Sequence, residues 1–334
     1  MSIKIGINGL GRIGRMIIRS LIENKNKNIE IKHINNRSNS ETSSLLLKYD
    51  SVHGKFKTNI NYKEKNLIIN KNKISFSQKE ELSKINWKKY GVDIVLECTG
   101  KFNSKEKCIQ HIKNGAKKVI VSAPCKGADK TIVYGVNHKS INKDDLIISA
   151  SSCTTNCLAP LASVINKEFE IEKGFMTTIH SYTAEQRLLD NSHKDPRRAR
   201  AAGQSIVPTS TGASKALGEI IPELKGKIEG IAMRVPTPNV SLVDLVFNTK
   251  NKLSVKKINE LFIKASNKEL KNVLDTTNEK LVSVDFNHIS NSAIVDLSLT
   301  SVVCDNMGKV SAWYDNEWGF ASRKNDLVEY IHKI

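Results

Sequence analysis

A cysteine at the start of a predicted helix is the first residue of this sequence with a clear chemical use. The apolar run 146–148 predicts a short strand, and apolar residues then recur at three- and four-residue spacing over 158–165. Cys153 therefore lies close to a helix N-terminus, where unpaired amide N–H groups favour the thiolate over the thiol. Because a thiolate attacks carbonyl carbon atoms, we hypothesise that Cys153 is a nucleophile. The alternative is a buried, inert cysteine.

A cysteine nucleophile needs a base or a charged partner, and the chain has 8 histidines. Only His180 ends a strongly apolar predicted strand, 174–180, and leads directly into a polar loop. An imidazole at that place would hold Cys153 as thiolate and then act as acid or base. The alternative is a structural histidine whose hydrogen bonds are satisfied within the fold.

A glycine-rich turn near the N-terminus predicts a dinucleotide site. Residues 3–7 predict a strand and residues 15–22 an amphipathic helix, and the spacing G-x-G-x-x-G lies between them. Gly9 permits the tight turn, Gly11 lets the backbone approach a pyrophosphate, and Gly14 allows close packing of helix on strand. The alternative is a glycine-rich turn without a ligand.

The end of the second predicted strand, 29–34, bears on the choice of cofactor. Folds that bind NAD usually place Asp or Glu there to bind the ribose hydroxyls, but this chain has Asn36 and Arg37. An amide does not repel a 2′-phosphate and a guanidinium pairs with one, so the pattern favours NADP or dual use. In the alternative, Asn36 serves the NAD ribose through hydrogen bonds.

The order of the predicted elements defines the fold class. Strands and helices alternate through about residue 150, which predicts an α/β protein with an N-terminal Rossmann-type dinucleotide-binding domain. Longer strands with fewer helices then predict an α+β catalytic domain with an antiparallel or mixed sheet. We expect the first domain to span 1–152, with a C-terminal helix 318–334 packing back on it, and the second to span 153–317. A polar, basic segment, 182–208, interrupts the second domain, and a loop of this length is usually functional.

Composition bears on compartment and partners. The 6 cysteines are scattered through 334 residues without a signal peptide or a metal-ligand spacing, which predicts reduced thiols, a cytoplasmic protein and no metal site. No apolar run approaches the roughly 20 residues that span a membrane. The net charge of +18 raises a basic nucleic-acid-binding protein as a rival of another class. Lysines interspersed with Asn and Ile, as in 24–28 and 70–73, favour a solvated basic surface instead, so no specific nucleic acid is expected.

Several motifs together resemble those of the phosphorylating glyceraldehyde-3-phosphate dehydrogenases over essentially the whole chain. Residues 151–157, SSCTTNC, are similar to the active-site signature of that family, and residues 6–15 to its glycine turn. Further similar segments, in the family's order, are 49–54 (YDSVHG), 97–100 (ECTG), 180–183 (HSYT), 197–202 (RRARAA), 208–213 (PTSTGA), 233–240 (MRVPTPNV) and 313–319 (WYDNEWG). Independent motifs in this order argue against chance agreement.

The resemblance implies reversible oxidative phosphorylation of D-glyceraldehyde 3-phosphate to 1,3-bisphosphoglycerate, in glycolysis or gluconeogenesis, by a homotetramer. Cys153 would attack the aldehyde to form a thiohemiacetal, and His180 would take up the proton as hydride leaves for NAD or NADP. Inorganic phosphate would then attack the resulting thioester. Erythrose-4-phosphate dehydrogenases, which share the fold and the Cys–His pair, are the nearest alternative, and phosphate dependence distinguishes the two.

The resemblance also implies the remaining site residues. The substrate's own phosphate would be held by Thr183 and Arg234. The attacking phosphate would be held by Ser152, Thr154, Thr211 and Gly212. The cofactor would be held by Asn8, Gly9, Gly11, Arg12, Ile13, Gly14, Asn36, Arg37, Thr99, Ser122, Asn191, Ser192 and Asn316, the last of which would fix the nicotinamide carboxamide.

The sequence departs from the family pattern at several of these places. Asn191 and Ser192 stand where a Leu-Pro pair is common in NAD-specific members, and a serine at the second position resembles NADP-using photosynthetic members. Together with Asn36, this pair favours NADP or dual specificity. Glu185 stands where Asp is usual beside the substrate phosphate, and Phe320 where Tyr is common near the nicotinamide. The last two changes put the fine geometry of the substrate in question, but not the chemistry.

Overall fold

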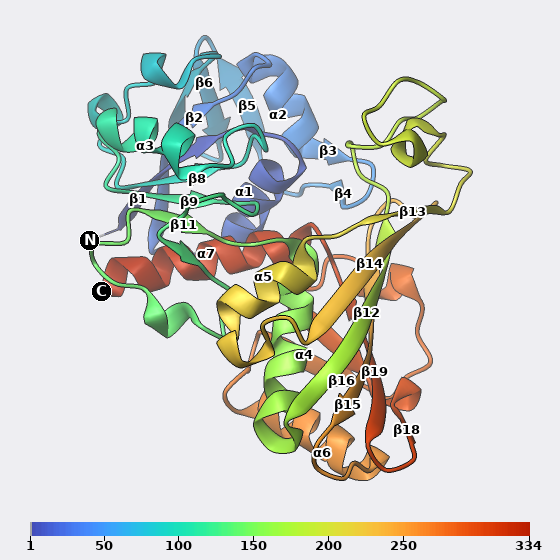
Figure 1. Cartoon of the computed structure of the whole chain (residues 1–334). Coiled ribbons are helices and arrows are strands. Elements are labelled where there is room, and N and C mark those ends of the chain that lie inside the picture. Colours follow the sequence, from blue (N-terminus) through green and yellow to red (C-terminus); the bar gives the residue numbers. More distant parts are fainter. Residues whose placement is uncertain (1) are drawn as a thin grey trace. The chain divides into compact units, whose positions relative to one another are not determined.

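The computed structural model describes residues 2–334 and divides them into two compact units (Figure 1). Unit 1 comprises the chain up to Ile132, together with His138–Ser151 and Ala321–Ile334. Unit 2 comprises Val133–Asn137 and Ser152–Phe320. The division thus assigns Ser152, Val133–Asn137 and the first turn of the last helix to the second unit, whereas the sequence analysis assigned them to the first domain.

Unit 1 is built on a doubly wound sheet. Its strands, in the order in which they pair, are β10 (Lys130–Thr131), β11 (Ile147–Ser149), β9 (Lys118–Val121), β8 (Ile94–Glu97), β1 (Ile3–Asn8), β2 (Ile29–Asn35), β7 (Asn72–Ser77), β6 (Asn66–Ile69) and β5 (Ile60–Lys63). Pairing is parallel from β10 to β7 and antiparallel beyond it, where β7, β6 and β5 form a meander at the edge. A separate small ribbon pairs β3 (Tyr49–Asp50) with β4 (Gly54–Lys55). The predicted Rossmann-type domain is confirmed.

The helices of unit 1 follow the local signals in the sequence. They are α1 (Arg12–Glu23), α2 (Ser40–Lys48), α3 (Lys105–Lys113) and the part of α7 (Trp318–Lys333) that begins at Ala321. Ser104 is the N-cap of α3, and its side chain accepts a hydrogen bond from the Lys107 amide. Asn325 of α7 donates to Ser20 Oγ of α1, so the C-terminal helix packs on the first helix of the same unit.

Unit 2 contains a mixed sheet. Its strands, in pairing order, are β13 (Val207–Ser210), β14 (Ile228–Val235), β12 (Ile171–Ser181), β15 (Ser241–Thr249), β19 (Met307–Tyr314), β17 (Ala293–Asp296) and β16 (Leu274–Thr277), with β18 (Ser301–Val303) against β19. β12 is parallel to β14 and antiparallel to β15, which confirms the expected mixed sheet. Buried and half-exposed residues alternate along β15, so one face of the sheet is apolar.

Three helices of unit 2 cover that apolar face: α4 (Cys153–Phe169), α5 (Ala213–Ile220) and α6 (Val255–Asn267) (Figure 1). The helical spacing of Leu158, Leu161 and Ile165 places all three side chains in this core, where each is fully buried. The polar segment 182–206 holds a single 3-10 turn (Pro196–Ala199) and otherwise no helix or strand. None of the helices described in residues 2–334 is long and apolar enough to cross a membrane.

Candidate active site

Cys153 is the first residue of α4, as the sequence predicts. Ser152 is the N-cap, and its Oγ accepts a hydrogen bond of 3.1 Å from the Thr155 amide. Before it, the fully buried Ser151 has φ +58°, a left-handed conformation that costs of order 1–3 kcal/mol in a residue other than glycine. A sharp, strained turn therefore delivers the Cys153 side chain to the positive end of the helix.

His180 lies beside the thiol. Its Nε2 is 3.5 Å from Cys153 Sγ, so the structure brings together the two residues expected to be catalytic. The imidazole stands near the end of β12 and is buried, with 4% of the residue exposed. This proximity joins a helix start and a strand end that are 27 residues apart in the chain.

The other side of the imidazole faces Arg234. Parallel pairing of β12 with β14 sets Arg234 opposite His180 in the register. Arg234 Nη1 is 2.7 Å from His180 Nδ1 and donates to Ser181 O at 3.0 Å, while Nδ1 itself is 2.7 Å from Ser181 O. A guanidinium only donates and a carbonyl oxygen only accepts, so Nδ1 satisfies one of these neighbours at a time.

This environment keeps His180 neutral. Burial, and after it the charge of Arg234, lowers the pKa of His180 to about 3, against a smaller opposing effect of its hydrogen bond to Ser181. The sequence analysis expected an imidazole able to hold Cys153 as a thiolate through its own charge. In this structure the neighbouring cation is Arg234, whose own pKa is lowered by burial against the opposing effect of Cys153, and the role of His180 toward the thiolate stays a prediction.

The buried Tyr314 packs against the site and forms hydrogen bonds with two threonines. Tyr314 Oη lies 3.0 Å from Thr154 Oγ1 and 2.9 Å from Thr178 Oγ1, and its ring meets His180 edge-on at 6.0 Å between centroids. Burial raises the pKa of Tyr314, so the phenol stays protonated. Thr154, expected to bind the attacking phosphate, is buried and uses its hydroxyl on Tyr314. Its hydroxyl therefore braces the start of α4.

Charged and polar side chains lie near Arg234 and in the loop after β12. Arg198 forms an ion pair of 2.5 Å with Glu185 and donates to Thr209 Oγ1 at 2.9 Å, and both Arg198 and Glu185 act on the pKa of Arg234. Beside Thr183, Gln186 Oε1 accepts from the Thr183 amide at 3.3 Å. The Gln186 Nε2 group is buried without a hydrogen-bond partner among the residues the structure describes. Arg198 and Gln186 were missed by the sequence analysis, although Arg198 lies within the quoted segment 197–202.

The remaining residues expected at the phosphates lie at other ends of elements. Gly212 is the N-cap of α5, and Thr211 Oγ1 accepts from the Ala213 amide at 3.2 Å. A Cβ at Gly212 would meet no atom within 4 Å, so the backbone there is open. Ser152 uses its Oγ as the cap of α4. The groups expected at the phosphates thus come from two helix starts, the loop after β12 and Arg234 on β14.

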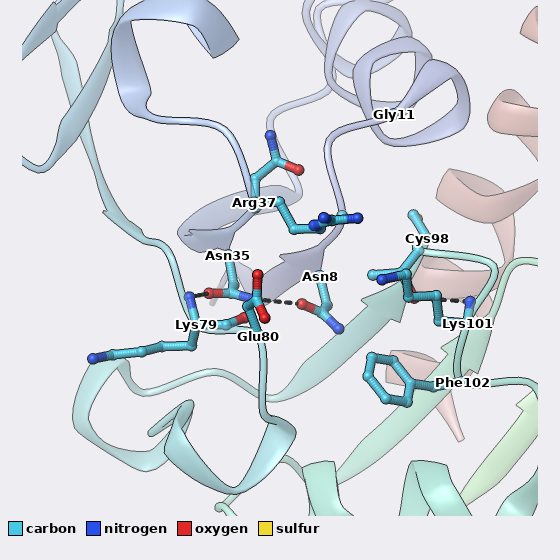
Figure 2. A pocket seen from close by; sticks show the side chains of 12 residues that line it. Asn8, Gly11, Asn35, Arg37, Lys79, Glu80, Cys98, Lys101 and Phe102 are labelled. Carbon is cyan, nitrogen blue, oxygen red and sulfur yellow. Dashed lines mark hydrogen bonds between the residues drawn. The ribbon is translucent and has the colours of Figure 1, made fainter.

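A separate cavity in unit 1 is lined by several of the residues expected at the dinucleotide (Figure 2). It has a volume of ≈ 230 Å³. Six of the expected cofactor residues line it: Asn8, Gly9, Gly11, Asn36, Arg37 and Thr99. The sequence analysis did not assign the other lining residues to the cofactor: Asn35, Lys79, Glu80, Cys98, Lys101 and Phe102.

The glycine turn has the geometry that a bound pyrophosphate requires. Gly9 has φ +94°, and a Cβ there would lie 2.8 Å from the Thr99 amide nitrogen. A Cβ at Gly14 would lie 2.2 Å from Gly9 O, so the start of α1 packs directly on the turn. A Cβ at Gly11 would meet nothing within 4 Å, and this residue is the N-cap of α1. The turn therefore leaves open backbone at a helix N-terminus, which fits a dinucleotide.

Other expected cofactor residues are engaged elsewhere. Arg12 forms a two-point ion pair with Asp50, at 2.5 and 3.0 Å, so its guanidinium is tied to the small ribbon β3–β4. This contact and two backbone amides hold the pKa of Asp50 far below its usual range, against the effect of burial. Ser122 donates to Glu97 O at 2.9 Å. Four of the expected cofactor residues do not line the cavity: Arg12, Ile13, Gly14 and Ser122.

Three expected cofactor residues belong to unit 2. Asn191 and Ser192 lie in the exposed segment 182–206, and Arg187 donates to Ser192 O. Asn316 is buried, and its Oδ1 accepts from Ser181 Oγ and Ser241 Oγ, both at 3.0 Å. That arrangement orients the carboxamide and directs its NH₂ group away from the two serines. Among residues 2–334, no group of three or more His, Cys, Asp or Glu side chains is arranged to hold a metal ion.

A dinucleotide-type glycine turn in one unit and a thiol–imidazole pair in the other are the parts of an oxidoreductase that works through a covalent thiol adduct. The comparisons agree with that class. Residues 3–105 match the model of the glyceraldehyde 3-phosphate dehydrogenase NAD binding domain, and residues 152–316 match that of the C-terminal domain. The chain belongs to the glyceraldehyde 3-phosphate dehydrogenase family.

Similarity to individual members extends over full length. The chain is 47% identical over 334 residues to glyceraldehyde-3-phosphate dehydrogenase of Xanthobacter flavus and 48% identical over 334 residues to that of Cereibacter sphaeroides, covering 100% of both partners each time. It is 48% identical over 332 residues to the enzyme of Geobacillus stearothermophilus, covering 99% of this chain and 98% of that one. This agreement favours an enzyme over the nucleic-acid-binding alternative.

Proposed function

We propose that this chain catalyses the phosphate-dependent oxidation of glyceraldehyde 3-phosphate to 1,3-bisphosphoglycerate, reversibly and with NAD or NADP. The observation that carries the proposal is the thiol of Cys153 at a helix start, 3.5 Å from His180 Nε2, with Arg234 on the far side of the imidazole. We also propose that it works in the cytoplasm as a homotetramer. The consecutive side chains of Leu188 and Leu189, 88% and 76% exposed, support association of copies that would cover them.

The first step is attack on the aldehyde. His180 Nε2 faces Cys153 Sγ and receives its proton as the sulfur bonds to the carbonyl carbon. The oxygen of the thiohemiacetal lies near the positive end of α4, where the Cys153 amide and the imidazole stabilise its charge. His180 returns the proton to that oxygen, which gives the neutral thiohemiacetal, and takes it up again as the carbon loses hydride and becomes a thioester. A bound nicotinamide dinucleotide supplies the hydride acceptor for this oxidation.

The cofactor residues of the proposal are those that line the cavity of unit 1. The amides at the start of α1 would receive the pyrophosphate, with Asn8 and Thr99 at the ends of β1 and β8 beside it. Asn316, with its carbonyl oxygen fixed by two serines, keeps an NH₂ group for the nicotinamide carboxamide.

Inorganic phosphate would then attack the thioester from a site built of Ser152, Thr211, Gly212 and Arg198.

Binding of the substrate's own phosphate should also change the pKa of His180, because Arg234 contacts both groups. In the free site, the guanidinium charge lies against His180 and disfavours its protonation. A dianionic phosphate bound by Arg234 and Thr183 neutralises that charge and draws the guanidinium away from Nδ1. Nδ1–H then donates to Ser181 O without competition, so the pKa of His180 rises when a proton has to be accepted.

Replacement of Arg234 tests this coupling. In Arg234→Gln, we expect the KM for glyceraldehyde 3-phosphate to rise by roughly 10- to 100-fold, because a charge-assisted contact to phosphate is lost. The pKa of His180 should also rise toward its ordinary value, because the neighbouring positive charge is gone. A histidine titration by NMR, compared with that of the unaltered chain, measures the second effect. An unchanged His180 titration would contradict the coupling.

Phosphate dependence tests the reaction itself. With glyceraldehyde 3-phosphate and NAD or NADP, we expect steady turnover only when phosphate or arsenate is present, because water does not substitute for the acyl acceptor. Steady turnover without either anion would instead indicate hydrolysis of the thioester, as in an erythrose-4-phosphate dehydrogenase. Failure to oxidise glyceraldehyde 3-phosphate under any condition would refute the proposed function.

The cofactor preference is a finer proposal: NADP or dual use. No carboxylate stands at the end of β2, where Asn36 donates to Ser43 Oγ and accepts from the Leu10 amide, and Arg37 and Lys79 line the cavity (Figure 2). These cations favour a 2′-phosphate by charge, although Glu80 also lines the cavity and opposes them.

A substitution at Asn36 measures that preference. We expect Asn36→Asp to lower kcat/KM for NADP by about tenfold or more, because a carboxylate repels the 2′-phosphate, and to leave kcat/KM for NAD within about threefold. The control is Asn36→Ser, which is neutral and should not discriminate against NADP by charge. A preference of the unaltered chain for NAD above tenfold would overturn the cofactor proposal.

A further inference from the structure

A buried carboxylate lies directly behind the dinucleotide cavity. Glu97 ends β8 and is 1% exposed. Its Oε1 accepts from the Thr99 amide at 2.8 Å and from Thr99 Oγ1 at 2.5 Å. Its Oε2 accepts from Asn8 Nδ2 at 2.6 Å and lies 3.0 Å from His111 Nε2. An amide N–H group reaches each of the two oxygens, so both oxygens of Glu97 act as acceptors.

The direction of the His111 hydrogen bond is fixed by a tryptophan. Trp87 Nε1 lies 2.9 Å from His111 Nδ1, and an indole N–H only donates. Nδ1 therefore accepts, and a neutral His111 carries its hydrogen on Nε2 and donates it to Glu97. Trp87 and His111 are both fully buried, and the indole belongs to the apolar core of unit 1. The chain of hydrogen bonds thus begins in the core.

The same chain ends at the cofactor cavity. Asn8 and Thr99 line the cavity, whereas His111 and Trp87 do not. While Asn8 Nδ2 is held by Glu97, Asn8 Oδ1 accepts from Asn35 Nδ2 at 2.8 Å (Figure 2). Asn35 Oδ1 in turn accepts from the Lys79 amide at 2.8 Å. Each polar atom of the Asn8 carboxamide is thereby engaged, so its orientation depends on Glu97.

We infer that His111 is a positioning residue for the cofactor: held by Trp87, it fixes Glu97, and Glu97 sets Asn8 and the Thr99 turn in the cavity. The inference rests on the proposed cofactor site. Without the His111 donor, one oxygen of the buried Glu97 carboxylate loses a hydrogen-bond partner. The rearrangement that costs the least free energy is a rotation of the Glu97 side chain, which releases Asn8 or Thr99. Affinity for the cofactor should then fall while the thiol chemistry of unit 2 stays intact.

The test compares two replacements of His111 in the full chain. In His111→Leu, we expect the dissociation constant of NAD and of NADP, measured by titration of protein fluorescence, to rise by about tenfold or more. The KM for the cofactor should rise by the same factor, with kcat at saturating cofactor within about threefold. In His111→Gln, an amide N–H can still donate to Glu97, so the dissociation constant should stay within about threefold of the original. Wild-type cofactor affinity in His111→Leu would overturn the inference.

A core variant separates positioning from stability. Val119→Ala removes fully buried methyl groups from the same core and should lower the melting temperature without changing the dissociation constant. If the dissociation constants of all variants follow their melting temperatures, the inference is wrong. If His111→Leu does not fold, Trp87→Phe, which loses the indole N–H donor together with part of a buried ring, takes its place. Its affinity is compared with that of Val119→Ala, and an unchanged affinity in it would equally overturn the inference.

One more variant distinguishes failure of this inference from failure of the proposed site. Asn8→Ala alters a residue that lines the cavity itself. If Asn8→Ala weakens cofactor binding and His111→Leu does not, only the positioning role of His111 fails. If neither variant changes cofactor binding, the cavity is not the cofactor site, and the proposed function loses that part of its support.

Discussion

In the Cys153→Ser variant, we expect kcat to fall by about 10⁴-fold or more, because a serine hydroxyl at the start of α4 is neither ionised nor a comparable nucleophile. Cofactor affinity should not change, since the variant keeps every residue that lines the cavity of unit 1 and keeps Asn316, which we propose for the nicotinamide. The neighbouring Cys157 offers no substitute, because burial raises the pKa of its thiol well above the usual value. Steady-state assays and a cofactor titration measure the two quantities.

The control for this variant is Cys304→Ser. Cys304 is an exposed free cysteine in the turn between β18 and β19, and its replacement should leave kcat within about twofold. Activity retained in Cys153→Ser would refute the assignment of the nucleophile. Activity lost in both variants would point to a general effect of thiol replacement on the fold, which the melting temperature would reveal.

The second large effect is expected in His180→Asn, with a fall in kcat of about 10²- to 10⁴-fold. The imidazole Nε2 that faces Cys153 Sγ is lost, and with it the group that moves protons to and from sulfur and oxygen. The rate at which iodoacetamide alkylates Cys153 near neutral pH should fall as well. The matched control is His332→Asn, an exposed histidine near the C-terminus whose loss should change neither rate.

The pH dependence of that alkylation carries a sharper expectation. His180 has a pKa held down to about 3 by burial and by Arg234, so in the free chain it is protonated only in strong acid. Its titration should therefore add no step to the alkylation rate between about pH 5 and pH 8, the range of an ordinary histidine. A step in that range that disappears in His180→Asn would contradict a neutral His180 and restore a thiolate–imidazolium pair.

Much of this site follows from local patterns. The start of α4 at Cys153 could be predicted because a strand, a small-residue turn and a helical spacing follow one another. The strand ending near His180 and the glycine turn before α1 are equally local, and so is the Ser104 cap of α3. Each depends on a few consecutive residues whose preferences agree with the final fold.

What could not be predicted depends on pairing between distant segments. Arg234 reaches His180 because β12 and β14 pair in parallel, which joins residues 54 apart and adds to the effect of burial in lowering the pKa of the histidine. Thr154 turns its hydroxyl to Tyr314, 160 residues away, and Arg12 binds Asp50. The residue types at these places are equally compatible with solvent or with a ligand, so only the tertiary structure decides among them.

The cavity of unit 1 shows the same limit. Lys79, Glu80 and Phe102 line it from loops that carry no motif of their own. Asn36 lines the cavity, yet its side chain is held by Leu10 N and Ser43 Oγ, so it shapes the turn and does not simply face a ribose. Sequence reasoning finds the position of such a residue, whereas its hydrogen bonds decide what it offers to a ligand.

The central claim is a covalent acyl intermediate on Cys153, and a single turnover without phosphate tests it most directly. With glyceraldehyde 3-phosphate, saturating NAD or NADP and no phosphate or arsenate, we expect a burst of one reduced cofactor per active chain and then little further turnover. Peptide mass spectrometry of protein quenched after the burst should locate the acyl group on Cys153. In a parallel sample that is not quenched, added phosphate should release the acyl group as 1,3-bisphosphoglycerate. A burst with no acyl group on Cys153, or an acyl group on another residue, would contradict the account.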